Sequence, residues 1–206
     1  MIVHDCVQGS DEWKKLRAGV PTASEFSRII TSTGEQSKSR FGYACDLAAE
    51  KFAGGPMDDS WAGNAWTERG KEVEAEARAR YEFQNDVAIQ QIGFCTSDDG
   101  VAGCSPDGLV GDEGMIEIKV LKSQHHVTAI LRFKKDGSID PGYIQQTQGQ
   151  LWVTGRKWVD LVFYSPLLPM LVVRQEPLKA VFNGLISNTA ALIIEREQVL
   201  KVLRAA

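Results

Sequence analysis

The segment Met-Ile-Glu-Ile-Lys-Val at residues 115–120 constrains the fold more than any other part of the chain. Alternate side chains of a β-strand point to opposite faces, so Ile116 and Ile118 share one face while Glu117 and Lys119 share the other. The apolar face predicts an interior strand of a sheet. A buried charge is costly unless it is paired or bound to a metal, so the polar face is a candidate site. Taken alone, a solvent-facing Glu-Lys pair is the commoner case.

A second acidic residue is placed near this strand by a predicted hairpin. Ser-Pro-Asp-Gly at residues 105–108 is typical of a turn, and the glycines at 111 and 114 predict another turn before the strand. A strand, a turn and a returning strand would bring Asp107 beside Glu117. These two carboxylates and the backbone carbonyl of Ile118 would supply the hard oxygen ligands that magnesium prefers.

The combined pattern Pro-Asp-x9-Glu-x-Lys indicates a metal-dependent phosphodiesterase. A metal-bound water can attack a phosphodiester while the ion stabilises charge on the phosphoryl oxygens. Lys119 would orient or activate that water and stabilise the developing negative charge. A catalytically silent DNA-binding or structural module with a stabilising metal is an alternative. Glu117 and Lys119 together count against it, because a structural metal site has no need of the lysine.

The rest of the chain alternates predicted helices and strands, with no internal repeat and no linker. Helices are predicted at 10–17, from 22 or 24 onward, and at 41–52, 61–83, 143–153 and 178–203, the one at 61–83 being the longest. Strands are predicted at 87–95, 101–104, 109–110, 115–120, 159–164 and 171–173, and a mobile loop at 34–39. This order predicts a single α/β domain over residues 1–206, with a central mixed β-sheet flanked by helices.

Composition narrows the class of protein. The net charge of −4 argues against a protein that coats nucleic acid by general attraction. A local basic groove is still possible, because residues 114–135 hold one acid, Glu117, against five lysine and arginine residues. The four cysteines have no C-x-x-C spacing, which predicts neither a zinc site nor a redox pair and fits a reducing cytoplasm. No apolar run approaches the length that a membrane span needs.

Six stretches of the sequence together resemble the lambda-exonuclease or YqaJ-type viral recombinase family of the PD-(D/E)xK nucleases. They lie at residues 9–19, 22–25, 69–74, 104–109, 117–119 and 145–154, in the order and spacing of the family. The resemblance implies a restriction-endonuclease-like core and a magnesium-dependent 5′-to-3′ exonuclease with two ions, in which manganese can substitute. It implies digestion of one strand of duplex DNA to leave a 3′ single strand. A structure- or sequence-specific endonuclease on the same hairpin is the alternative within the superfamily.

The resemblance also implies partners and a setting. Its members act at the ends of double-stranded DNA, form a ring of three subunits around the duplex, and work in recombination beside a single-strand annealing protein. It implies the cytoplasm of a bacterial host and a phage or prophage origin. A ring would explain how an acidic chain stays on DNA. Members place an arginine after the Glu-x-Lys, where this chain has Lys-Ser-Gln-His-His at 122–126.

Site residues carry over from the family position by position. Asp107 and Glu117 resemble the metal-binding carboxylates, and Lys119 resembles the catalytic lysine. The resemblance implies that Glu74 is an acid that supports the metals through water. It implies that Gln148 is a catalytic glutamine that flanks the active site. It also implies that Arg17 and Ser24 form the pocket for a terminal 5′-phosphate. A guanidinium fork and a hydroxyl near a helix start are good phosphate ligands.

Overall fold

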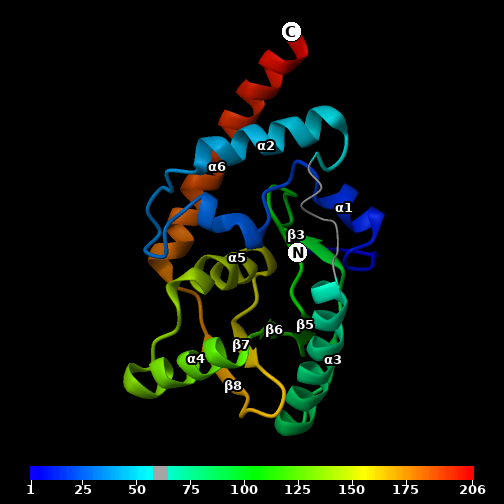
Figure 1. Cartoon of the computed structure of the whole chain (residues 1–206). Coiled ribbons are helices and arrows are strands. Elements are labelled where there is room, and N and C mark those ends of the chain that lie inside the picture. The colour runs from blue at the N-terminus through cyan, green and yellow to red at the C-terminus, as the bar shows by residue number, and fades with distance from the viewer. Residues whose placement is uncertain (58–64) are drawn as a thin grey trace.

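The computed structural model describes the backbone of residues 1–57 and 65–206, and the side chains of residues 1–57 and 72–206. Its elements follow one another as β1 (Ile2–His4), α1 (Asp11–Arg17), the 3₁₀ helix η1 (Ala23–Arg28), α2 (Arg40–Ala53), α3 (Ala65–Asn85), β2 (Ile89–Gln90), β3 (Phe94–Thr96), β4 (Gly103–Cys104), β5 (Gly108–Val110), β6 (Gly114–Val120), α4 (Ser123–Asp136), the 3₁₀ helix η3 (Pro141–Tyr143), α5 (Ile144–Thr154), β7 (Trp158–Tyr164), β8 (Leu171–Gln175) and α6 (Lys179–Ala205) (Figure 1).

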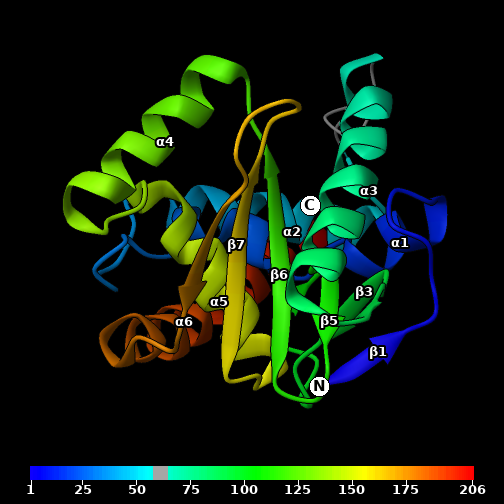
Figure 2. The same ribbon diagram turned by 90° about the horizontal axis from the view of Figure 1, so that it is seen from below.

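A five-stranded sheet in the order β2-β5-β6-β7-β8 forms the centre of the molecule. Strands β6 and β7 run parallel, whereas the other neighbouring strands are antiparallel. Helix α3 covers one face and α5 the other (Figure 2). A smaller sheet in the order β1-β3-β4 lies beside it. The predicted mixed sheet flanked by helices is therefore confirmed.

Strand β6 is an interior strand, as its sequence predicts. Ile116 and Ile118 are buried and pack with Ala77 and Tyr81 of α3. The opposite face of the strand, which carries Glu117, turns toward α5. The alternation in the sequence therefore separates an apolar face under α3 from a polar face under α5.

Other predictions for local structure are wrong in part. The strand expected at 87–95 is divided between β2 and β3, which belong to different sheets. At the break, a Cβ on Gly93 would lie 1.8 Å from the backbone oxygen of Cys6, so the N-terminal segment crosses there. Strand β1 and helix α4 are not anticipated by the sequence patterns. Within the described chain the longest helix is α6, with 27 residues against 21 for α3. The predicted start of α3 at 61–64 lies outside the described residues.

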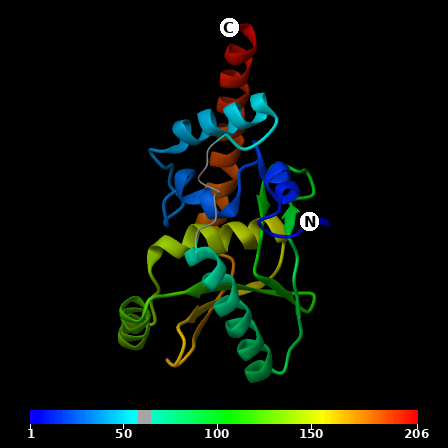
Figure 3. The ribbon, with the colours of Figure 1, turned by 45° about the vertical axis from the view of Figure 1, so that its right-hand side comes forward.

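Helices α2 and α6 pack together and project from the sheet, with the C-terminal end of α6 outermost (Figures 1 and 3). Arg40 of α2 binds Glu195 of α6 at 2.7 Å, and Arg196 donates to the carbonyl of Gly19 at 2.6 Å. The first bond joins the two helices to each other, and the second attaches them to the segment between α1 and η1. Among the described helices, none combines the length and apolarity that crossing a membrane requires.

Candidate active site

The hairpin of β5 and β6 brings Asp107 to the middle of β6. Strand β5 begins at Gly108, opposite Ile116, so the next part of the β6 edge has no strand partner on that side. The carboxylate of Asp107 takes that place: its Oδ2 accepts a hydrogen bond from the Ile118 amide at 2.6 Å. Because the N–H and C=O of one strand residue point to the same edge, the Ile118 carbonyl faces the same side. The predicted meeting of Asp107 with Glu117 across a hairpin is present.

Glu117 lies at the centre of a hydrogen-bonded network and is only 4% exposed. Its Oε1 accepts from Lys119 Nζ at 2.7 Å and from Gln146 Nε2 at 2.6 Å. Its Oε2 accepts from Gln150 Nε2 at 2.5 Å. Lys119 also donates to Gln146 Oε1 at 2.8 Å. Residues four apart on a helix share a face, so α5 presents both glutamines to the same carboxylate.

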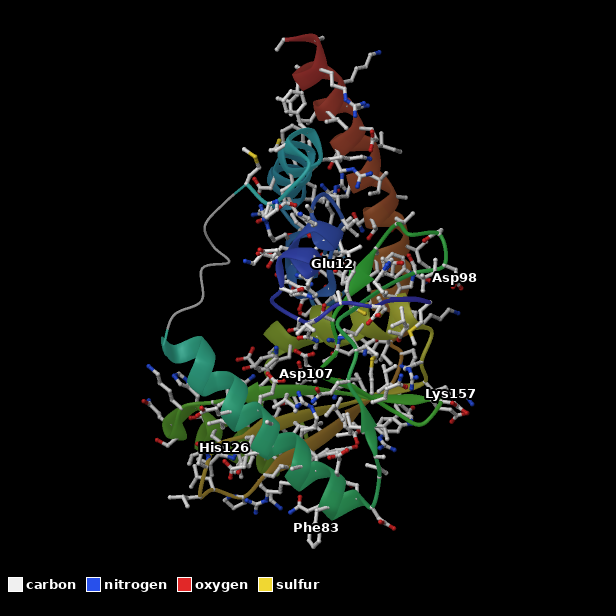
Figure 4. All side chains as sticks on the ribbon, turned by 90° about the vertical axis from the view of Figure 1, so that its right-hand side faces the viewer. Glu12, Phe83, Asp98, Asp107, His126 and Lys157 are labelled. Atoms are coloured by element: carbon white, nitrogen blue, oxygen red, sulfur yellow. The ribbon has the colours of Figure 1, made fainter. Side chains whose placement is uncertain are left out.

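Helix α3 brings a further acid to the open edge of β6. Glu74 pairs with Arg78 at 2.5 Å, and Arg78 Nε donates to the backbone carbonyl of Asp107 at 3.1 Å. Figure 4 shows Asp107 at the level where α3 and the sheet meet the half of the molecule that carries α1 and α2. Glu74 is thus tied through Arg78 to the strand segment that bears Asp107.

Burial and neighbouring carboxylates both act on Asp107 and Glu74. Burial raises the pKa of Asp107 well above its usual range, and Glu117 and Glu74 raise it further. Burial likewise raises the pKa of Glu74, against the lowering effect of Arg78. For Lys119, burial acts to lower the pKa, but Glu117 and Asp107 prevail and raise it. A divalent cation would relieve the repulsion among these carboxylates.

The donors present suit magnesium or manganese. Asp107, Glu117 and the Ile118 carbonyl offer only oxygen, and magnesium is commonly held by one or two carboxylates plus waters and substrate phosphate. In the described part of the chain, no three His, Cys, Asp or Glu side chains form a cluster that could hold an ion. An ion held by Asp107, Glu117 and the Ile118 carbonyl would take its remaining ligands from water and substrate phosphate.

A basic pocket lies beside the acids. Arg17, at the end of α1, is 7% exposed. Its Nη2 donates to Thr22 Oγ1 at 3.2 Å and to Ser24 Oγ at 3.3 Å, and its Nη1 lies 3.5 Å from Ser105 Oγ. The guanidinium stacks over the Trp13 ring at 4.3 Å. Burial lowers the pKa of Arg17, which still leaves a guanidinium charged at neutral pH.

One cleft of about 420 Å³ joins the basic pocket to the acids. Its wall is formed by Gln8, Trp13, Arg17, Ala23, Ser24, Glu25, Ser105, Asp107, Glu117, Gln146 and Gln150. The predicted phosphate-binding pair and the predicted metal ligands therefore open into the same space. They come from α1, η1, the β5–β6 hairpin and α5, which are distant in sequence.

Close packing of η1 on α5 fixes one wall of this cleft. A Cβ on Gly149 would lie 2.3 Å from the Phe26 ring, so only glycine lets the two elements approach. Ala23 and Phe26 are buried in that contact and thereby place Ser24 on the cleft side. At the neighbouring helix α1, Ser10 accepts from the Trp13 amide at 3.2 Å, the N-cap that the sequence predicts.

The prediction that Gln148 flanks the site is wrong. Its Nε2 donates to the Glu176 carbonyl at 2.9 Å and its Oε1 accepts from the Leu178 amide at 2.7 Å, so it holds the segment before α6. Residues two apart on a helix do not share a face. The glutamines at the site are Gln146 and Gln150, whose spacing of four is the signal that could have identified them. Ser105 is a third residue that sequence reasoning did not single out.

The adjacent histidines His125 and His126 point apart. His126 is buried, with its Nε2 2.7 Å from the Pro169 carbonyl oxygen. His125 lines a separate cavity of about 100 Å³ together with Arg132 and Tyr143. Neither histidine lines the cleft that contains Asp107.

Comparison with known proteins bears on this site. The family model described as the YqaJ-like viral recombinase domain matches residues 12–157. The solved structure of an alkaline exonuclease, LHK-Exo from Laribacter hongkongensis, is 32% identical and has a TM-score of 0.80, over 95% of this chain and 97% of that one. A structure of the same enzyme in complex with dAMP has the same identity, coverage and TM-score against this chain.

A more distant structure shares the fold. The phage-related exonuclease from Haemophilus somnus 129PT is 15% identical with a TM-score of 0.69, over 89% of this chain and 96% of that one. No curated protein matches the chain. The chain therefore has the PD-(D/E)xK-type fold of the alkaline exonucleases.

Proposed function

Because the chain belongs to the YqaJ-like viral recombinase family, we propose that it is a magnesium-dependent exonuclease acting on the ends of double-stranded DNA. It removes nucleotides from the 5′-ended strand and leaves a 3′ single strand. The similarity to an alkaline exonuclease over nearly the whole chain supports nuclease activity. Strand polarity and the choice of duplex rest on the family resemblance.

The observation that carries the proposal is the shared cleft. Arg17 and Ser24 supply a buried cation and a hydroxyl, which suit a terminal phosphate. Asp107 and Glu117 line the same cleft, where an ion bound to them would meet a phosphodiester close to that end. A site that binds the end phosphate beside the metal favours terminal over internal cleavage.

The residues of the cleft divide the chemistry among them. Asp107, Glu117 and the Ile118 carbonyl would hold the ion, which supplies an activated water and neutralises phosphoryl charge. Lys119 orients the attacking water and stabilises the negative charge that builds on the phosphate. Gln146 bridges Lys119 and Glu117 and so fixes their relative position. Glu74 supports the ions through water, held in place by Arg78.

Strand polarity is the decisive experiment. A linear duplex carrying a 5′-phosphate and a different label at each end is incubated with the protein, with magnesium, with manganese, or with EDTA. We expect loss of the 5′-ended strand with either metal and none in EDTA. Digestion of a closed circular duplex at a comparable rate would favour an endonuclease instead, and degradation from 3′ ends would reverse the proposed polarity.

We also propose, from the family resemblance, that three subunits form a ring around DNA. The ring would work in recombination beside a single-strand annealing protein. Large apolar side chains exposed along α6, including Ile186, Ile194 and Val202, support a contact surface on the projecting helix pair. Light scattering should report three times the chain mass of 22.7 kDa. A monomer at micromolar concentration would contradict the ring.

A further inference from the structure

Gln150 has one half of its amide engaged and the other half without a partner. The side chain is 1% exposed and lines the wall of the cleft. Its Nε2 donates to Glu117 Oε2 at 2.5 Å. Its buried Oε1 has no hydrogen-bond partner among the residues that the structure describes.

The orientation of this amide is fixed by its neighbour. Exchanging nitrogen and oxygen would set Gln150 Oε1 against a carboxylate oxygen of Glu117, an acceptor facing an acceptor. The unpartnered oxygen is therefore a property of the site. A buried acceptor without a donor destabilises the folded protein, and the great majority of buried polar groups have a hydrogen-bond partner. A donor that enters the cleft with the ion or the substrate would remove that destabilisation.

Glu117 shows which side of the site that donor occupies. Its Oε1 receives two hydrogen bonds, from Lys119 and Gln146, whereas its Oε2 receives only the one from Gln150. A carboxylate oxygen has about two lone-pair sites, so Oε2 keeps the capacity to bind an ion. Magnesium retains several waters when bound, and each can donate hydrogen bonds. An ion at Oε2 would bring such waters to the neighbouring Oε1 of Gln150.

We propose that Gln150 is a positioning residue for the metal: its Nε2 holds Glu117 in the ion-binding orientation and its Oε1 accepts from the ion's hydration shell. The inference rests on the proposed function, because it takes the ion at Asp107 and Glu117 as given. Removing the Gln150 amide should therefore change the affinity for the metal more directly than the rate of the chemical step. Outer partners of this kind change metal affinity by about 10–100-fold when they are removed.

Calorimetric titration of magnesium and manganese into the DNA-free protein tests this. Gln150→Met keeps the length of the side chain and removes both polar atoms. Gln148→Met is the matched control, because it removes an equally buried amide from the same helix whose partners lie away from the cleft. We expect Gln150→Met to bind magnesium about tenfold or more weakly than wild type and Gln148→Met to bind as wild type does. Thermal unfolding in EDTA reports any general loss of stability.

Each outcome separates this inference from the proposed function. Wild-type affinity in Gln150→Met, or an equal loss in Gln148→Met, overturns the role of Gln150 while wild type still binds metal and digests DNA. A wild-type protein that binds neither metal and leaves DNA intact overturns the proposed function as well. If Gln150→Met does not fold, Gln150→Asn keeps a polar amide but withdraws it from Glu117, and the same loss of affinity is expected.

Discussion

Replacing Lys119 by alanine separates its role in catalysis from its role in charge balance. Lys119 Nζ lies 2.7 Å from Glu117 Oε1, and the Lys119 side chain is 23% exposed. Because charge on the phosphate grows only in the transition state, losing one preorganised cation should lower turnover by about 10²–10³, or about 3–4 kcal/mol. Binding of duplex ends, measured in calcium so that no cleavage occurs, should remain close to wild type.

The same substitution should also lower stability when no metal is present. A hydrogen bond to a charged group contributes about 1.5–3 kcal/mol, and for a chain of this size each kcal/mol shifts Tm by about 2–4 °C. We therefore expect Tm of Lys119→Ala in EDTA to fall by about 3–12 °C, and magnesium to recover part of that loss.

Single-turnover digestion of a 5′-phosphorylated duplex measures the catalytic effect, and Lys119→Arg is its control. Arginine keeps the positive charge but has a planar fork and does not readily lose a proton. Recovery of the rate with arginine would assign the effect to electrostatic stabilisation, whereas no recovery would assign it to positioning or proton transfer. Near-normal turnover in Lys119→Ala would refute the reasoning, since Lys119 would then serve only as the ion-pair partner of Glu117.

Three further outcomes are expected. Arg17→Ala should reduce the preference for phosphorylated over hydroxyl 5′ ends by about tenfold or more, since charge-assisted hydrogen bonds contribute about 1.5–3 kcal/mol; equal rates on both ends in wild type would contradict the phosphate pocket. In EDTA at pH 7, Asp107→Asn should unfold at a higher temperature than wild type. The folded-state pKa of Asp107 is raised, so the folded form binds its proton more tightly and loses stability as pH rises from the unfolded pKa to the folded one. Magnesium should raise the Tm of wild type but not that of Asp107→Asn. A higher Tm for wild type than for Asp107→Asn in EDTA would show that the carboxylates do not repel one another. Gly149→Ala should lower the free energy of unfolding by about 1–3 kcal/mol, because the added Cβ overpacks against Phe26. Gly42→Ala is the control: it lies on an exposed part of α2, where a Cβ meets only one atom at 4.0 Å. That change should raise the free energy of unfolding by about 0.5–1 kcal/mol. A stable Gly149→Ala protein would remove the close approach of η1 as an explanation for the shape of the cleft.

The sequence by itself determined the β6 strand and its two faces. The alternation around Glu117 is a local property of a pleated strand, and the turn residues between Asp107 and Met115 fix the return of the hairpin. The helices at α1, α2 and α5 follow from caps and periodicity, which are also local. Asp107, Glu117 and Lys119 are therefore identifiable from local patterns alone, whereas Glu74 is identifiable only through the family resemblance.

Tertiary structure alone decided which glutamine serves the site. Gln145, Gln146, Gln148 and Gln150 are chemically equal along α5, and the rotation of that helix over the sheet turns Gln146 and Gln150 toward Glu117 and Gln148 toward α6. Periodicity marks a spacing of four as one face but does not say which face meets the strand.

Local sequence patterns likewise do not predict that residues 87–95 are divided between two sheets. The division depends on Cys6, which is distant in the chain and crosses at Gly93. The joining of Arg17 to the acids also depends on distant contacts, because Trp13 of α1 donates to Ser105 at 2.9 Å and η1 packs closely against Gly149. Local patterns decide what each segment can form; contacts between distant segments decide which side chains share a cleft.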